Sequence, residues 1–213
     1  MNEVTEQISK WRGSFGQEYT DRNPQTLQEM EDLYRKNYGF TRSELNRRFL
    51  DDMDRAMRIL EVGSNIGNQL LCLQKMGFTS LYGIELQSYA VELAKSRTKG
   101  INLIQGEASD IPFKDGFFDM VFTSGVLIHI SPSNLPSVLN EIHRCTRNYI
   151  FGFEYFSDVT QEIPYRGNSD LLWKADFAGI YLELFDDLWL QKEERIKYMQ
   201  NENVDTMYLL QKK

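Results

Sequence analysis

Short apolar runs alternate with longer amphipathic segments along most of this chain. The apolar runs predict buried strands at residues 59–62, 80–85, 101–104, 117–125 and 149–153. The segments between them carry apolar residues at helical spacing and predict helices at residues 69–76, 88–97 and 135–147. This alternation of strands and helices predicts a mostly parallel sheet with helices packed on it.

Two more apolar runs lie near the end of the chain, at residues 188–193 and 204–211, and a turn region at residues 201–203 joins them. They predict a C-terminal antiparallel hairpin that extends the sheet. Together with the earlier strands, they give the expected fold: α/β, with a seven-stranded, mostly parallel sheet.

Residues 1–57 are expected to form an N-terminal helical lid, and residues 58–213 the α/β domain. A helix is expected from Leu27 to Tyr38, and Thr41 or Ser43 is expected to cap the next one. The basic residues of that next helix are expected on its solvated face: Arg42, Arg47 and Arg48.

The lid has two interpretations, which the sequence leaves open. It could pack on the sheet edge as a plain structural layer. It could instead close over a ligand, with Tyr19 and Arg22 pointing inward and Arg22 facing a ligand carboxylate.

A glycine turn follows the first strand and carries the strongest chemical signal. The turn runs from Gly63 to Gly67, and a helix begins directly after it. Gly63 permits a positive φ or a close approach of the ligand, and the new helix offers unpaired N–H groups. The turn lacks the G-x-G-x-x-G pattern of dinucleotide sites. Glu61 would also repel a pyrophosphate, so a cationic ligand such as S-adenosylmethionine fits better.

A second acidic residue, Glu85, ends the next strand, 85 − 63 = 22 residues after Gly63. A carboxylate about 20 residues after such a turn can accept hydrogen bonds from both ribose hydroxyls. The alternative is that Glu85 only caps the helix that starts at Ser88. Its place at the end of an apolar strand favours the ribose role.

Four segments, in this order along the chain, resemble the motifs of class I S-adenosylmethionine-dependent methyltransferases. The first is Glu61-x-Gly63-x-x-x-Gly67, where Asn65 replaces a glycine that is usual in the family. The others are Gly106-Glu107-Ala108 with Ile111-Pro112-Phe113, Phe118-Asp119-Met120-Val121, and Leu127-x-His129-Ile130. The resemblance covers about residues 59–153. It implies a Rossmann-like fold and S-adenosylmethionine as the cofactor.

The resemblance also implies roles for single residues. Glu107 would accept a hydrogen bond from the adenine amino group, with Asp110 as its alternative, and the Ala108 N–H would reach a ring nitrogen. Ser124 and Gly125 would lie at the carboxyl edge of the sheet. The lid interpretation, the spacing of Glu85 and the resemblance together give the expected cofactor-binding residues: Tyr19, Arg22, Glu61, Gly63, Ser64, Asn65, Gly67, Glu85, Leu86, Glu107, Ala108, Ser124 and Gly125.

The acceptor site is expected at the same edge, after the fourth and fifth strands. His129 is the first candidate for a general base and Glu154 the second, although an amine acceptor needs no base. A helix is expected to begin at Leu171 and run towards Phe185. The candidate acceptor-binding residues, which could equally be an ordinary loop and helix, are Tyr155, Tyr165, Arg166, Trp173 and Lys174.

A narrower resemblance involves residues 15–23, 165–167 and 172–177, which are similar to the pseudaminic acid biosynthesis-associated methylases. It implies a sugar, sugar nucleotide or related bacterial surface-glycan precursor as the small-molecule acceptor. Two alternatives stay open. The chain could bind S-adenosylmethionine or S-adenosylhomocysteine without turnover, or it could methylate a macromolecule.

Composition narrows the partners and the compartment. The chain has 213 residues and a formal net charge of -7, and no basic stripe indicates nucleic-acid binding. No apolar run is long enough to span a bilayer, the N-terminus has no secretory pattern, and a cytoplasmic location is expected. Cys72 and Cys145 show no metal-type spacing and are expected to be buried thiols, so no metal site is expected. The oligomeric state is left open.

Overall fold

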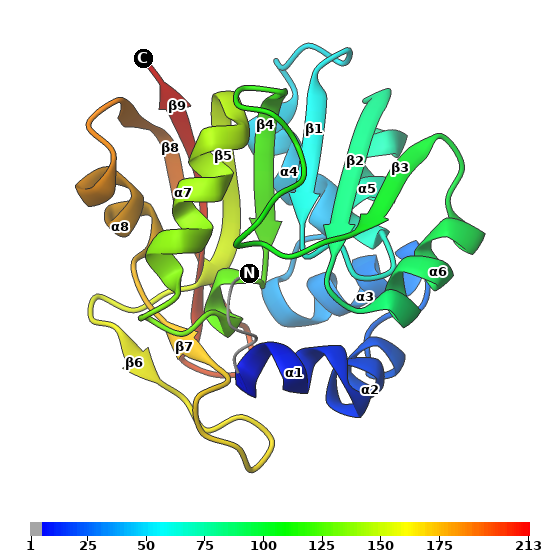
Figure 1. The fold of residues 1–213 in the computed structure, drawn as a ribbon, viewed down its shortest axis with the longest axis vertical. Helices are drawn as coiled ribbons and strands as arrows, with labels where there is room; N and C mark the ends of the chain where they lie inside the picture. The colour runs from blue at the N-terminus through cyan, green and yellow to red at the C-terminus, as the bar shows by residue number, and fades with distance from the viewer. Residues whose placement is uncertain (1–5) are drawn as a thin grey trace.

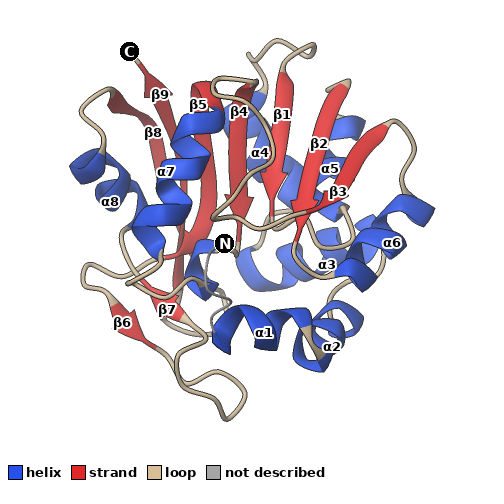
Figure 2. Ribbon diagram, in the orientation of Figure 1, coloured by secondary structure: helices blue, strands red, loops and turns tan. Residues whose placement is uncertain are grey.

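Seven strands form one twisted sheet in the computed structural model, which describes residues 6–213 (Figures 1 and 2). Along the sheet the order is β3-β2-β1-β4-β5-β9-β8. β1 pairs in parallel with β2 and β4, and only β9 runs antiparallel to both of its neighbours. The strands are β1 Arg58–Val62, β2 Ser80–Glu85, β3 Ile101–Gln105, β4 Phe118–Ser124, β5 Thr146–Tyr155, β8 Leu188–Lys197 and β9 Val204–Lys212.

This topology confirms the expected fold and indicates where a ligand should bind. The chain leaves β1 towards β2 on one side and returns to β4 on the other. The strand order therefore reverses between β1 and β4, and open α/β sheets bind ligands at the carboxyl ends of the strands that flank such a point.

Two apolar cores lie on the two faces of the sheet. On one face, α4 (Arg42–Leu50) and α5 (Asn68–Lys75) pack on the sheet, together with Ala94 of α6 (Ser88–Arg97). On the other face lie α7 (Leu135–Cys145) and α8 (Phe177–Leu184). Both faces of the central strands are buried, which explains why their sequences are nearly continuous apolar runs.

The carboxyl edge of the sheet is covered by segments from both ends of the chain. α1 (Glu6–Arg12) and α2 (Ser14–Arg22) lie across this edge, as Figure 1 shows, and α3 (Leu27–Tyr38) lies beside it. The short helix η1 (Leu127–His129) and the hairpin of β6 (Gln161–Glu162) and β7 (Trp173–Lys174) cover the rest.

The signals for starting and ending the lid helices act as expected. Gly39 ends α3 in the left-handed region at φ 79°. Of the two candidate caps for α4, Thr41 is the one used, since its hydroxyl accepts from Glu44 N while the Glu44 side chain accepts from Thr41 N. This capping box satisfies two backbone donors that the helix cannot pair internally.

The expected helix beginning at Leu171 is wrong. Residues 171–173 are buried and not helical, and β7 pairs with β6. The helix begins only at Phe177, where the Asp176 side chain accepts from Gly179 N. The apolar run fills the core as a strand-like segment, because the adjacent hairpin pairs its backbone.

The expectation for Arg42 is also wrong. Its side chain is 0% exposed, and its guanidinium lies 4.6 Å from the Phe153 ring centroid. Nη1 lies 3.5 Å from the Tyr34 hydroxyl. A planar guanidinium can be buried against aromatic rings, which a helical pattern of charges does not reveal.

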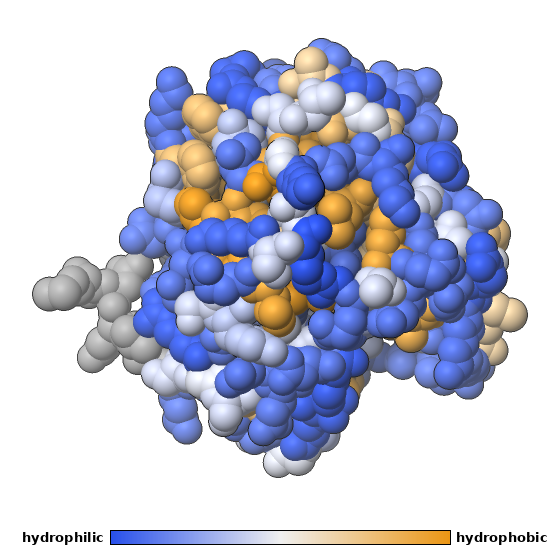
Figure 3. Space-filling view, turned by 90° about the vertical axis from the view of Figure 1, so that its right-hand side faces the viewer, coloured by the Kyte–Doolittle hydropathy of each residue, from blue (hydrophilic) through white to orange (hydrophobic). Residues whose placement is uncertain are grey.

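The edge strand β3 leaves part of the apolar layer visible at one end of the sheet. Figure 3 views that side, where hydrophobic side chains show within a mostly hydrophilic surface.

Both cysteines are buried free thiols, as expected. Within residues 6–213, none of the helices combines the length and apolar character needed to cross a bilayer.

Candidate functional site

One cavity of about 630 Å³ occupies the carboxyl edge of the sheet. Residues at the ends of β1, β2, β4 and β5 line it from the side of the sheet, and residues of α1, α2, α3 and η1 line it from the other side. The volume is in the range of pockets that hold small ligands, roughly 300–1,000 Å³. The cavity therefore lies where the reversal of strand order predicts a ligand.

The glycine turn shapes the floor of this cavity. Gly63 has φ 72°, and a Cβ at this position would lie 2.6 Å from Cγ2 of Val126. The backbone N–H groups of Gly63 and Ser64 both donate to the Ile84 carbonyl oxygen, at 2.9 Å. Gly63 is therefore required by its backbone conformation and by the closeness of the segment after β4.

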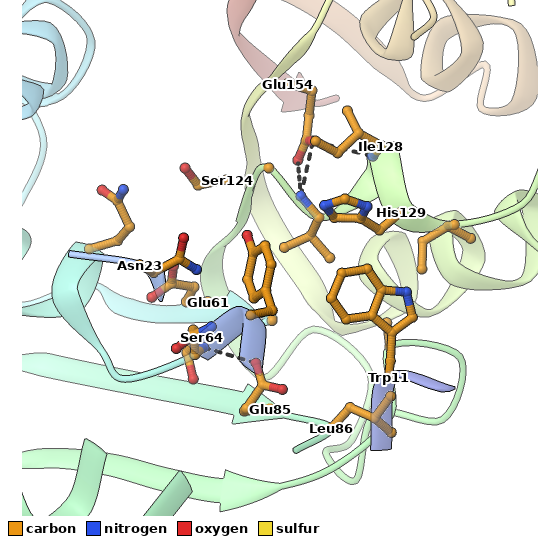
Figure 4. A pocket seen from close by; sticks show the side chains of 18 of the residues that line it. Trp11, Asn23, Glu61, Ser64, Glu85, Leu86, Ser124, Ile128, His129 and Glu154 are labelled. Carbon is orange, nitrogen blue, oxygen red and sulfur yellow. Dashed lines mark hydrogen bonds between the residues drawn. The ribbon is translucent and has the colours of Figure 1, made fainter. Parts of the chain in front are cut away.

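Glu85 is held at the end of β2 by backbone donors. Oε2 accepts from Asn65 N at 2.9 Å, and Oε1 accepts from Gln87 N at 2.8 Å. Burial raises the pKa of Glu85, whereas these backbone donors lower it. The carboxylate thus has a fixed orientation on the cavity wall (Figure 4).

The wall beside Glu85 is rich in oxygen atoms that lack partners. Glu61 Oε2, Ser64 Oγ and Asn65 Oδ1 are buried and accept no hydrogen bond from the described residues. Burial also raises the pKa of Glu61 well above its usual value. Unpaired buried acceptors are costly, so this wall fits a ligand that brings donors and positive charge. The ammonium, sulfonium and ribose groups of S-adenosylmethionine meet that requirement.

Hydrogen bonds and an ion pair connect the N-terminal helices to the rest of the cavity wall. Gln87 Nε2 donates to the carbonyl oxygens of Arg12 and Gly13 at 2.8 and 3.0 Å. Gln7 Nε2 donates to the His129 carbonyl oxygen at 2.8 Å. Arg12 forms an ion pair with Glu107, the predicted adenine partner. These contacts favour the interpretation of the N-terminal helices as a lid over a ligand.

His129 lies beside the N-terminal helices and is surrounded by aromatic rings. Its Nδ1 donates to the Leu171 carbonyl oxygen at 2.7 Å, because a carbonyl oxygen can only accept. The ring centroid lies 4.7 Å from that of Trp11 and 6.0 Å from that of Tyr19. Burial lowers the pKa of His129 to about 4. The neutral imidazole therefore carries its lone pair on Nε2.

Glu154 has a different environment. It is 1% exposed, and its carboxylate accepts from the N–H groups of Val126 at 3.0 Å and Ile128 at 3.4 Å (Figure 4). Burial raises its pKa to about 7. These bonds fix η1, so the carboxylate positions the segment that carries His129.

Most of the residues expected at the cofactor line the cavity, with two exceptions. Arg22 forms an ion pair with Glu18 at 3.4 Å, away from the lining. Gly67 also does not line it and instead adopts φ 81° at the start of α5. The residues that do line it are Tyr19, Glu61, Gly63, Ser64, Asn65, Glu85, Leu86, Glu107, Ala108, Ser124 and Gly125.

The expected acceptor-binding residues fall into two groups, those that line the cavity and those that do not. Tyr155 and Tyr165 line the cavity. Trp173 is packed in the interior at 6% exposure, and Lys174 donates to Asn203 Oδ1 at 2.5 Å. Arg166 occupies an exposed turn at φ 51°. The structure therefore does not bring these last three side chains to the cavity.

Several lining residues were missed by the sequence analysis. They come from segments far apart in the chain, so no local motif joins them. The helix predicted from Leu27 to Tyr38 contains two of them, but its pattern does not indicate that they face a ligand. The missed residues that line the cavity are Trp11, Tyr34, Tyr38, Gln87, Phe153, Tyr198 and Asp205.

Comparison with known proteins agrees with this geometry. Residues 60–149 match the methyltransferase domain family. Over 87 residues, the chain is 31% identical to an uncharacterised methyltransferase of Synechocystis sp., a match that covers 41% of each chain. Over 194 residues, it is 22% identical to a phosphoethanolamine N-methyltransferase of Plasmodium falciparum, covering 80% of this chain and 73% of the relative.

Among solved structures, the chain is similar to a Burkholderia thailandensis 1,6-didemethyltoxoflavin-N1-methyltransferase with bound 1,6-didemethyltoxoflavin and S-adenosylhomocysteine. The TM-score is 0.73 at 16% identity, with 100% of this chain and 91% of the other covered. The strand order and the cavity at the carboxyl edge define the Rossmann-like fold of class I methyltransferases. Residues 60–149 thus match a methyltransferase domain family, and the chain has the fold of the methyltransferase structures to which it is similar.

Proposed function

We propose that this protein transfers a methyl group from S-adenosylmethionine to a small polar acceptor bound in the same cavity. The observation that carries the proposal is the extent of this cavity, which runs from Glu85 at the end of β2 to Asp205 in β9. These strands are four places apart in the sheet, about 19 Å at about 4.8 Å per strand. The length leaves room for an acceptor beyond the cofactor residues.

The cofactor itself supplies the reactive methyl group, so the protein's task is binding and alignment. Ser124 and Gly125 lie between the predicted cofactor end and the acceptor end, and His129 lines the same cavity. Its Nε2 lone pair can take a proton from an acceptor hydroxyl, because Nδ1 is already bonded to the Leu171 carbonyl. An amine acceptor would need only orientation from this ring.

A sugar or a related surface-glycan precursor remains the proposed acceptor class, from the resemblance of residues 15–23, 165–167 and 172–177 to the pseudaminic acid-associated methylases. Among the described residues, the cavity lining contains no lysine or arginine. A phosphate inside it would lack a charged partner. The sugar part thus fits the interior better than a phosphate does, and the phosphates of a sugar nucleotide would have to lie outside. The cytoplasmic location expected from the sequence would suit such a precursor.

The test combines binding and turnover. Calorimetry with S-adenosylhomocysteine measures the cofactor site directly. Incubation with S-adenosylmethionine labelled in its methyl group, together with pools of sugars, sugar nucleotides and amines, is expected to label a small molecule. Tight cofactor binding without product in any pool would favour the non-catalytic alternative. Label found only in protein or RNA would overturn the proposed acceptor class.

A further inference from the structure

A buried carboxylate with one free oxygen lies at the end of the cavity farthest from Glu85. Asp205 is 1% exposed and pairs with Tyr155 across the β5–β9 ladder. Its Oδ2 accepts from the Tyr38 hydroxyl at 2.5 Å. Its Oδ1 is buried, lines the cavity and accepts no hydrogen bond from the described residues. A buried charged acceptor without a donor is destabilising, so it indicates a group that a ligand would satisfy.

Aromatic rings surround this carboxylate. The Tyr38 hydroxyl lies 2.8 Å from that of Tyr198, and the two rings are 4.7 Å apart. The Tyr38 ring also lies 5.7 Å from Phe153 and 5.3 Å from Tyr34. We call Asp205, Tyr34, Tyr38, Phe153 and Tyr198 the tyrosine pocket. Aromatic faces combined with one carboxylate are a recurrent means of binding ammonium groups.

Two cations lie near the tyrosine pocket, but neither lines the cavity. Lys174 donates to Asn203 Oδ1 and lies 5.5 Å from the Tyr155 ring centroid. Arg42 stacks against Phe153, and its Nε and Nη2 have no hydrogen-bond partner among the described residues. Burial is the largest effect on the pKa of Asp205 and raises it to about 6, whereas the Tyr38 and Tyr198 hydroxyls and then the charges of Lys174 and Arg42 lower it. No ion pair to Asp205 is found within residues 6–213.

We infer that the tyrosine pocket binds a protonated amino group of the acceptor, with Asp205 Oδ1 as its hydrogen-bond acceptor. This inference rests on the proposed function and narrows the acceptor to a small molecule that carries an amine. Asp205 lies two strands from the end of β4, about 10 Å at about 4.8 Å per strand. An ammonium group has no lone pair to attack a methyl group, so it serves as the recognition group rather than the methylated atom.

The test uses ethanolamine as the probe, ethylene glycol as its neutral analogue and acetate as an anion. Binding at pH 8 is followed through the ring NMR signals of the tyrosines, with and without S-adenosylhomocysteine. Ethanolamine is expected to bind at least about tenfold more tightly than ethylene glycol, the size of one charge-assisted hydrogen bond. Acetate is expected to cause no saturable shift.

Asp205→Asn keeps the shape of the side chain and is expected to abolish the preference for ethanolamine. Asp186→Asn is the matched control, because Asp186 is exposed and does not line the cavity. Equal binding of ethanolamine and ethylene glycol would overturn the inference. So would an Asp205→Asn variant that binds ethanolamine unchanged, which would make Asp205 a structural partner of Arg42 only. If the wild type did not bind S-adenosylhomocysteine, that result would count against the proposed function. The ethanolamine titration without cofactor would still test the tyrosine pocket by itself.

Discussion

The imidazole of His129 donates from Nδ1 to the carbonyl oxygen of Leu171 at 2.7 Å, which joins the segment after β4 to the segment before β7. This bond selects the tautomer with a free lone pair on Nε2. His129→Ala is therefore expected to lower kcat for a hydroxyl acceptor by about 100-fold to 10,000-fold, the usual contribution of a general base. The rate of methyl transfer at saturating S-adenosylmethionine measures this change in kcat.

His143→Ala is the matched control for this substitution. His143 stacks on Phe185 and bonds to Asp187, outside the cavity. Its loss is expected to affect stability and leave kcat near the wild-type value. If the two alanine variants retained equal kcat for a hydroxyl acceptor, His129 would not be a base.

Gly63 and Gly116 allow the effect of space to be separated from the effect of backbone conformation. Both have positive φ, 72° and 57°. A Cβ at Gly63 would lie 2.6 Å from Val126 Cγ2, whereas nothing lies within 4 Å of one at Gly116. Each alanine is expected to lower the free energy of unfolding by about 1–2 kcal/mol through left-handed strain.

The clash should then distinguish the two variants. Gly63→Ala is expected to lower the free energy of unfolding by about 1–3 kcal/mol more than Gly116→Ala does, because the new Cβ overpacks the turn. It is also expected to weaken S-adenosylhomocysteine binding. Gly116→Ala should leave that affinity unchanged. Denaturant unfolding and calorimetry measure the two effects. Equal affinities in the two variants would show that the turn has no role at the ligand.

Glu85 provides a direct test of the cofactor site. Its carboxylate is oriented by Asn65 N and Gln87 N and lines the cavity. Glu85→Ala is expected to weaken S-adenosylhomocysteine binding about tenfold or more, because two charge-assisted hydrogen bonds to ribose would be lost. His129→Ala should weaken it less. Comparable losses in calorimetry would contradict the separate roles given to the two residues.

The sequence predicted the parts of this molecule that are determined locally. The apolar strands and the Gly63 turn were expected because neighbouring residues determine the hydrophobic period, the helix caps and the backbone conformation. The position of Asp205 beside the cavity was not expected, since it depends on the insertion of β9 between β5 and β8. Arg42 was expected in solvent, because a helical charge pattern does not reveal the rings of Tyr34 and Phe153 on which it stacks.

Three of the five predicted acceptor residues do not line the cavity, for a related reason. Arg166, Trp173 and Lys174 were chosen from a loop rich in polar and aromatic side chains. The loop folds into the β6–β7 hairpin, which places Trp173 in the interior and Lys174 against Asn203. Pairing between short, distant strands is a tertiary property, so a single segment gives little sign of it.

Glu154 should give stability a measurable dependence on pH. Burial raises its pKa from 4.5 to about 7, so the folded protein holds this proton after the unfolded chain has lost it. Stability from this group is complete below pH 4.5 and is lost as the pH rises through 7, by about 3 kcal/mol in all. Glu154→Gln is expected to flatten the curve of unfolding free energy between pH 4.5 and 7.

Glu141→Gln is the contrasting variant for this measurement. The Arg144 side chain lowers the pKa of Glu141, so the sign is reversed and its stabilisation is lost as the pH falls. Denaturant unfolding across the pH range compares the variants. A Glu154→Gln curve with the wild-type slope would mean that Glu154 is ionised throughout, like an exposed carboxylate.

The corner between α1 and α2 should control access to the cavity without affecting the core. A Cβ at Gly16 would lie 1.9 Å from the Trp11 carbonyl oxygen, whereas one at Gly13 would have its nearest contact at 3.3 Å. Gly16→Ala is therefore expected to separate α1 from α2, and Gly13→Ala to be tolerated. No residue of α1 is buried, so the unfolding midpoint of the domain should stay near that of the wild type.

Opening of the lid would be seen in two measurements. Gly16→Ala is expected to make residues 6–22 sensitive to limited proteolysis, and to weaken S-adenosylhomocysteine binding by about tenfold, which corresponds to an overpacking cost of about 1.4 kcal/mol. Trp11, Gly16 and Tyr19 line the cavity, so their displacement removes contacts from any bound ligand. Wild-type affinity in a variant whose lid is cleaved would show that α1 and α2 cover the cavity without contributing to binding.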